Sequence, residues 1–190
     1  NGVNITHHSK AIITQCLFHN TVYPAVAICE KSFSLVQKCE IKDSQMSGLI
    51  VRFASKAKIE NCLISNSKTF GVCISDSKGV GIIKTLINGS GETAINAYNH
   101  SNVFVKDSYL LGPSKQGFNV FCGAVVSSVN CVIMGMKDTT AWIHHAGSGC
   151  FLKTVVSYKP INPQDDILLT IDEICESFDE NQADFSEASF

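Results

Sequence analysis

The sequence predicts an all-β fold, a right-handed, single-stranded parallel β-helix of about seven coils. Three observations lead to this prediction. Small residues recur with a period of 23 through most of the chain, and fixed-period similarity of this length is typical of a solenoid. Within each unit the apolar residues lie two positions apart, which is the period of a strand. Equivalent positions keep the same character from unit to unit, as stacked coils require.

Seven units are expected, each beginning at a small residue. Five of the six intervals are 23 and the last is 24. With this alignment Trp142 takes the second position of the last unit and His144 takes the fourth. Both side chains are therefore expected to point into the core, His144 as a core histidine. The seven opening residues are Gly2, Ala25, Gly48, Gly71, Ala94, Gly117 and Ala141.

Each unit is predicted to contain three short strands. Inward side chains are expected at unit positions 2 and 4, 10 and 12, and 15 and 17, because alternate residues of a strand point to opposite faces. Position 14 is polar in every unit, which indicates an outward corner between the second and third strands. Coils stacked about 4.8 Å apart would make a rod roughly 30 Å long.

Four of the nine cysteines fall in one inward column, at Cys16, Cys39, Cys62 and Cys131. Thr85 and Ser108 take the same position in two other units, so the column requires a compact side chain and indicates packing. Paired cysteines two to four residues apart, as in zinc sites, do not occur in this column. We therefore expect no metal site and no cofactor. A stack of free thiols favours a reducing compartment, and hence a cytoplasmic location.

Charge divides the chain into two parts. Residues 1–160 hold all 15 Lys and Arg with eight acids, whereas residues 161–190 hold nine acids and no base. The prediction is a β-helix over 1–160, then an acidic helix at about 165–178 and a loose tail. The helix either caps the solenoid or docks a partner, and the sequence leaves both open. Its apolar docking face consists of Ile167, Leu168, Ile171, Ile174 and Phe178.

Catalytic carboxylates are expected as pairs on neighbouring coils if the protein cleaves glycans. Glu30 and Asp76 share unit position 6, but they are two coils apart with Phe53 between them. No phosphate-binding loop, nucleophile elbow or nucleic-acid module is present, and no apolar run reaches the roughly 18 residues of a membrane span. These patterns predict a protein without enzymatic activity, nucleic-acid partner or membrane span.

One outward surface is expected to bind a partner. It is formed by the first strand of several units and is richer in apolar and aromatic residues than a solvated face requires. The alternative is that a loop or the C-terminal helix covers it. The candidate partner-binding residues are Ile50, Arg52, Phe53, Tyr98 and Phe121.

Units such as the run from Gly48 to Ile64 (GLIVRFASKAKIENCLI) resemble the repeats of intracellular pectate-lyase-like β-helix modules, and in particular the Shc-binding, Nessun dorma-like family of centralspindlin partners. The resemblance covers roughly residues 1–160. It implies a non-catalytic scaffold in cytokinesis and growth signalling, with a centralspindlin-like complex and a signalling adaptor as partners at the spindle midzone and midbody. Two alternatives stay open: a carbohydrate-active enzyme or glycan-binding module of the pectate-lyase-like fold, and the substrate-recognition β-helix of an F-box ubiquitin ligase.

Overall fold

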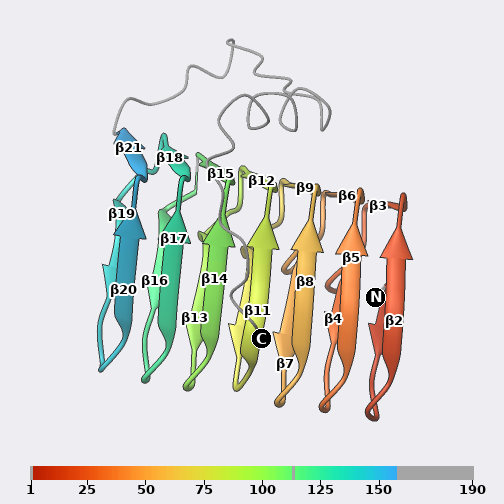
Figure 1. Cartoon of the computed structure of the whole chain (residues 1–190). Helices are drawn as coiled ribbons and strands as arrows, with labels where there is room; N and C mark the ends of the chain where they lie inside the picture. The colour runs from red at the N-terminus through yellow and green to blue at the C-terminus, as the bar shows by residue number, and fades with distance from the viewer. Residues whose placement is uncertain (1, 113, 158–190) are drawn as a thin grey trace.

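The chain winds through seven coils that build three parallel sheets (Figure 1). The computed structural model describes residues 2–112 and 114–157. Each coil contributes one strand to each sheet, and each strand pairs with the equivalent strand of every adjacent coil. The predicted parallel β-helix of seven coils is confirmed. The helix expected at about 165–178 and its docking face, Ile167, Leu168, Ile171, Ile174 and Phe178, lie outside the described residues.

The three sheets are called A, B and C in the order in which the chain visits them. Sheet A consists of β1 (Val3–Ile5), β4 (Val26–Ile28), β7 (Leu49–Arg52), β10 (Phe70–Ser75), β13 (Thr93–Tyr98), β16 (Gln116–Val120) and β19 (Thr139–Ile143). Sheet B consists of β2 (Lys10–Thr14), β5 (Phe33–Gln37), β8 (Lys56–Glu60), β11 (Lys78–Ile83), β14 (Asn102–Lys106), β17 (Val125–Val129) and β20 (Ser148–Leu152). Sheet C consists of β3 (Leu17–His19), β6 (Glu40–Lys42), β9 (Leu63–Ser65), β12 (Leu86–Asn88), β15 (Tyr109–Leu111), β18 (Val132–Met134) and β21 (Val155–Ser157).

The register corrects the sequence alignment in the last coil. In β16 and β19, Asn119 pairs with Trp142 and Val120 with Ile143, so the period of the earlier coils continues there unchanged. Ala141 and Ile143 therefore occupy the inward positions, and the expected inward placement of Trp142 and His144 is wrong. The alignment failed because it followed the small residue Ala141, whereas the pairing with β16 places Ile143 at an inward position.

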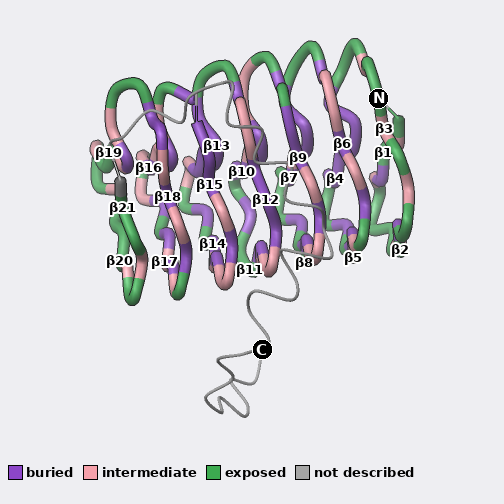
Figure 2. The backbone as a smooth tube through the Cα atoms, turned by 90° about the horizontal axis from the view of Figure 1, so that it is seen from above, coloured by how far each residue is buried: buried purple, intermediate pink, exposed green. Residues whose placement is uncertain are grey.

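The core fills the interior of the solenoid, and buried residues recur in every coil (Figure 2). The inward columns are aliphatic along most of their length, so stacking buries each side chain against its equivalents in the neighbouring coils. Cys39, Cys62 and Cys131 are buried as expected, and Cys16 in the first coil is half-buried. The expected alternation of inward and outward residues thus accounts for the core.

Two kinds of corner separate the sheets. Between sheets B and C a single residue turns the chain with φ near +50°, for example Asn61 or Asn130, and these are the polar residues of unit position 14. Between sheets A and B, most coils use two successive left-handed residues, such as Phe53 and Ala54. In coils 2 to 6 a buried small residue follows, which is serine except for Ala124. This second corner differs in coil 4, where the candidate site lies.

Candidate functional site

Coil 4 has a shorter turn between sheets A and B than its neighbours. Only Asp76 is left-handed there, whereas coil 5 uses both Asn99 and His100. The missing residue is recovered inside β11, where the register shifts between Lys78 and Val80. Gly79 is the extra residue, and its φ of +81° is one that glycine adopts without steric cost. The wall of the solenoid is therefore set back at coil 4.

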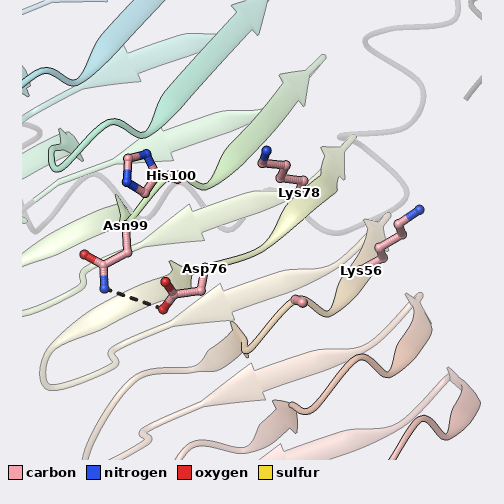
Figure 3. A pocket seen from close by; sticks show the side chains of 6 residues that line it. Lys56, Asp76, Lys78, Asn99 and His100 are labelled. Carbon is pink, nitrogen blue, oxygen red and sulfur yellow. Dashed lines mark hydrogen bonds between the residues drawn. The ribbon is translucent and has the colours of Figure 1, made fainter.

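The shorter turn leaves a notch of about 320 Å³ between coils 3 and 5 (Figure 3). Coil 3 supplies one wall, coil 4 the floor and coil 5 the other wall. Ser77 follows this turn. Its hydroxyl is buried and has no hydrogen-bond partner among the described residues. The lining residues are Ala54, Lys56, Asp76, Lys78, Asn99 and His100.

Neighbouring residues hold several of these side chains in place. The Asn99 side-chain amide donates a hydrogen bond to the Asp76 carboxylate over 3.5 Å. The His100 ring packs against Gly123 of the next coil, where an added Cβ would lie 2.5 Å from His100 Nδ1. The Lys56 stem lies near Gly79, and its ammonium group extends away from the Asp76 carboxylate in Figure 3. The lysine can therefore meet a ligand that arrives from outside.

The notch combines groups for binding an anion with groups for moving a proton. Lys56, Lys78 and Asp76 make no ion pair within residues 2–112 and 114–157. Two lysines, an imidazole and a carboxylate that line one notch can together neutralise a ligand's negative charge and exchange a proton with it. No group of three or more metal-ligating side chains occurs in the described part of the chain. The chemistry that the lining side chains themselves supply is acid–base chemistry.

A ladder of stacked rings runs along the outer face of sheet A from coil 5 to coil 7. The Tyr98 and Phe121 rings stack with centroids 5.2 Å apart and planes at 6°. His144 continues the ladder at 5.1 Å from Phe121, and Trp142 stacks on His144 at 4.7 Å. These rings form one aromatic surface that begins beside the notch, because Tyr98 immediately precedes Asn99.

Amide groups lie next to this ladder in the neighbouring outward column. The Asn119 amide nitrogen donates to the Asn96 side-chain oxygen over 2.9 Å, and the Asn119 oxygen lies 3.1 Å from His144 Nε2. Asn96 in turn donates to Cys73 Sγ over 3.8 Å. Burial raises the pKa of the Cys73 thiol, so it stays protonated at neutral pH. Asn96 is itself buried, so Asn119 is the amide of this pair that lies partly open beside the rings, where it can meet a polar ligand with apolar faces.

The predicted partner-binding residues lie on this same face but in two groups. Ile50, Arg52 and Phe53 belong to coil 3, where the Arg52 guanidinium lies 5.1 Å from the centre of the Phe53 ring. Tyr98 and Phe121 belong to coils 5 and 6. Ser75 separates the groups, because it pairs with Arg52 on one side and Tyr98 on the other. Partner binding at these residues stays a prediction.

Sequence reasoning missed the notch and two members of the ladder. Asp76 was compared only with Glu30 at the same unit position, whereas the notch joins different positions of three coils. Because the turn of coil 4 is one residue shorter, Lys78 pairs with Asn102, one position out of step with the pairing of the rest of β11. The glycines at 79 and 81 in an otherwise branched strand were the available signal for a bulge. His144 and Trp142 were missed because of the one-residue slip in the last coil.

Comparison with known proteins identifies the fold family. A family model described as a right handed beta helix region matches residues 1–154. The chain belongs to this right-handed β-helix family. The match establishes the hand of the solenoid and the coarser part of the resemblance noted from the sequence. No curated protein matches the chain.

Two solved structures resemble this β-helix. A periplasmic alginate epimerase, AlgG, aligns with a TM-score of 0.62 and 7% identity over 82% of this chain and 47% of that protein. The A-module of the Azotobacter vinelandii mannuronan C-5 epimerase AlgE6 aligns with a TM-score of 0.47 and 14% identity, over 84% of this chain and 57% of that one. The chain thus spans about half the length of these structures. At 7% identity the likeness to AlgG concerns the fold alone.

These comparisons correct the function expected from the sequence. The expectation was a non-enzymatic scaffold of cytokinesis, yet AlgG, a solved protein that shares the fold, is an alginate epimerase. The predictions of a scaffold and of a chain without enzymatic activity are therefore wrong, and the carbohydrate-active alternative is the better supported one. The expected protein partners and cytoplasmic location stay predictions. Within the described residues no helix is long and apolar enough to span a membrane.

Proposed function

We propose that this β-helix is a carbohydrate-active protein that binds an acidic polysaccharide at the coil-4 notch and transfers a proton there. The observation that carries the proposal is the lining of the notch, which Lys56 and Lys78, without an ion pair among the described residues, share with Asp76 and His100. Support also comes from AlgG, a β-helix that acts on alginate, a polysaccharide of uronic acids. No comparison supports the finer resemblance to the Shc-binding, Nessun dorma-like family.

A uronic acid carries its carboxylate on C-5, and this makes the C-5 proton the one most readily exchanged. The two lysines would bind that carboxylate and offset the negative charge that develops when the proton leaves. The His100 imidazole would accept the C-5 proton, forming a carbanion stabilised through the carboxylate. Return of a proton to the opposite face would invert the centre, whereas loss of the C-4 oxygen substituent would cleave the chain. General acid–base catalysis of this kind contributes about 10²–10⁴-fold in rate.

Asp76 and the ladder would then position the substrate. The Asp76 carboxylate, held by the Asn99 amide, accepts hydrogen bonds from sugar hydroxyl groups. A polysaccharide that leaves the notch along the solenoid axis meets Tyr98, Phe121 and Trp142. Carbohydrate surfaces combine apolar C–H faces with hydroxyl groups, so rings and neighbouring amides suit them.

Proton exchange at C-5 in D₂O is the direct test. The protein is incubated with polymannuronate, polyguluronate and polygalacturonate, and deuterium at C-5 is measured by NMR together with unsaturated ends. We expect deuterium incorporation with at least one polyuronate. His100→Gln should lower the rate by about 10²-fold or more. Lys78→Gln and Asp76→Asn should weaken binding, as measured by calorimetry.

Matched controls come from the same unit positions on other coils. His8→Gln and Glu30→Gln repeat the chemical changes of His100→Gln and Asp76→Asn away from the notch, and they should leave exchange unchanged. A mutant that moves the extra residue, with Gly79 deleted and a glycine inserted after Asp76, should fill the notch and abolish binding. Binding without any exchange would sink the enzymatic step, and equal effects at His8 and His100 would refute the site itself.

A further inference from the structure

A second hollow lies on the outer face of sheet B. Its volume is about 700 Å³, large enough for several side chains. It exists because Gly81 stands where the neighbouring coils carry Lys58 and Phe104, and an added Cβ at Gly81 would meet no atom within 4 Å. The wall residues that matter here are Phe33, Lys56, Lys58, Ile83 and Phe104.

The hollow combines apolar walls with positive charge. Five lysines lie on the strands of sheet B, at positions 10, 56, 58, 78 and 106, against the single acid Glu60. Glu60 is engaged by Lys58 over 2.9 Å, which leaves the rest of the sheet basic. Phe33 is 45% exposed, and Ile12, on the same face, is 72% exposed. A surface that is apolar in the middle and basic around it can bind a helix whose apolar face is flanked by acidic residues. The apolar face would pack in the hollow and the acids would lie near the lysines.

Residues 161–190 of this chain have that composition. They carry nine acids and no base, and their apolar residues between Ile167 and Phe178 recur with the spacing of one helix face. We propose that this acidic segment folds as a helix over about 165–178 and docks its apolar face in the Gly81 hollow. The proposal does not depend on the activity at the notch.

The length of the connection fits this docking. β21 ends at Ser157, so seven residues precede Asp165, and an extended chain of that length spans about 24 Å. The hollow centres on coil 4, three coils from β21, which is a displacement along the axis of about 14 Å. A short connection also keeps the segment at an effective concentration on the order of millimolar, so that even a weak contact is occupied.

Amide hydrogen exchange of the intact chain tests the docking directly, with residues 165–178 as the reporter. Gly81→Trp fills the hollow in a position where its Cβ meets nothing, so the β-helix should remain folded. We expect exchange in residues 165–178 to accelerate about tenfold or more in this mutant, because an undocked helix of this length is only marginally stable. Ser127→Trp is the matched control, since it occupies the same column two coils away and does not line the hollow.

A second pair of mutants tests the charge. Lys56→Glu combined with Lys58→Glu should release the segment at physiological salt, whereas Lys137→Glu combined with Lys153→Glu makes the same change of net charge on exposed residues elsewhere. Melting temperatures of all mutants confirm that the β-helix is intact.

Three outcomes would overturn the proposal. They are no protection of residues 165–178 in the intact chain, equal release in Gly81→Trp and Ser127→Trp, and protection that disappears on dilution. The last would mean that a second copy of the chain supplies the contact.

Discussion

The imidazole of His100 rests on the backbone of Gly123 in the next coil. A Cβ at position 123 would lie 2.5 Å from His100 Nδ1, and the φ of Gly123 is +73°. In the preceding coils this corner carries a side chain, such as that of Lys31 or Ala54, and glycine at 123 leaves the space that the ring occupies. The orientation of His100 at the notch therefore depends on a missing side chain one coil away.

Gly123→Ala should displace the His100 ring and strain the turn. The left-handed conformation costs a non-glycine residue about 1–2 kcal/mol, so a modest loss of stability is expected alongside the displacement. If Gly123 acts as a positioning residue, C-5 exchange should fall in Gly123→Ala while the affinity for polyuronate changes little. The comparison mutant is Lys31→Gly, which relaxes the equivalent turn of coil 2 at a residue that does not line the notch. An altered stability with unchanged exchange would leave Gly123 a purely structural role.

Ile64→Asp should unfold the β-helix. Ile64 is fully buried in sheet C between its equivalents Ile41 and Ile87, so an aspartate there would bury a charge without a partner. Such a burial costs several kcal/mol, comparable to the whole stability of a domain. Ile12→Asp makes the same chemical change at a side chain that is 72% exposed and should be tolerated. Circular dichroism melts of the two mutants check the register, and similar melts would count against it.

Most of the fold could be predicted because stacked coils repeat the same physical requirement once in every coil. The inward column of Ile41, Ile64 and Ile87 is recognisable in the sequence for this reason. The last coil was read one residue out of phase because Ala141 looks like a unit opening, and only pairing with β16 places Trp142 outside. The notch was not predicted because coil 4 has one residue fewer in its turn and one more in β11. The period of 23 is therefore unchanged, and an alignment of the repeats does not show the difference. Gly79 can be identified as the extra residue only from the pairing of β11 with β8 and β14.

Phe121→Ala should destabilise the outer face of sheet A. The ring stacks with Tyr98 at 5.2 Å and with His144 at 5.1 Å, so its removal breaks two aromatic contacts. Each such pair contributes about 0.5–1.5 kcal/mol beyond the area buried, and the loss should therefore reach about 1–3 kcal/mol. Urea denaturation measures it, with Tyr23→Ala as a control at an aromatic residue that is 59% exposed. Equal losses in the two mutants would show that the stack adds nothing to burial.

Alkaline pH should destabilise the β-helix through the buried Cys131 thiol. Burial raises the pKa of the Cys131 thiol, so the folded protein keeps this proton at a pH where the unfolded chain loses it. The stabilising contribution is complete below the unfolded pKa of about 8.5 and falls as the pH rises above that value, by up to about 1.4 kcal/mol per pH unit for one thiol. Denaturation series from pH 7 to pH 10 should show this decline.

Cys131→Ser removes that titration while keeping the local contacts. Ser108 occupies the equivalent position one coil earlier and donates to the Lys106 carbonyl over 2.7 Å, as the Cys131 thiol donates to the Val129 carbonyl. The serine mutant should therefore lose less stability between pH 8.5 and pH 10 than the parent. Cys122→Ser, at an exposed thiol, should follow the parent curve. If Cys131→Ser and the parent decline in parallel, Cys131 does not hold its proton through burial, and the alkaline sensitivity has to come from other groups.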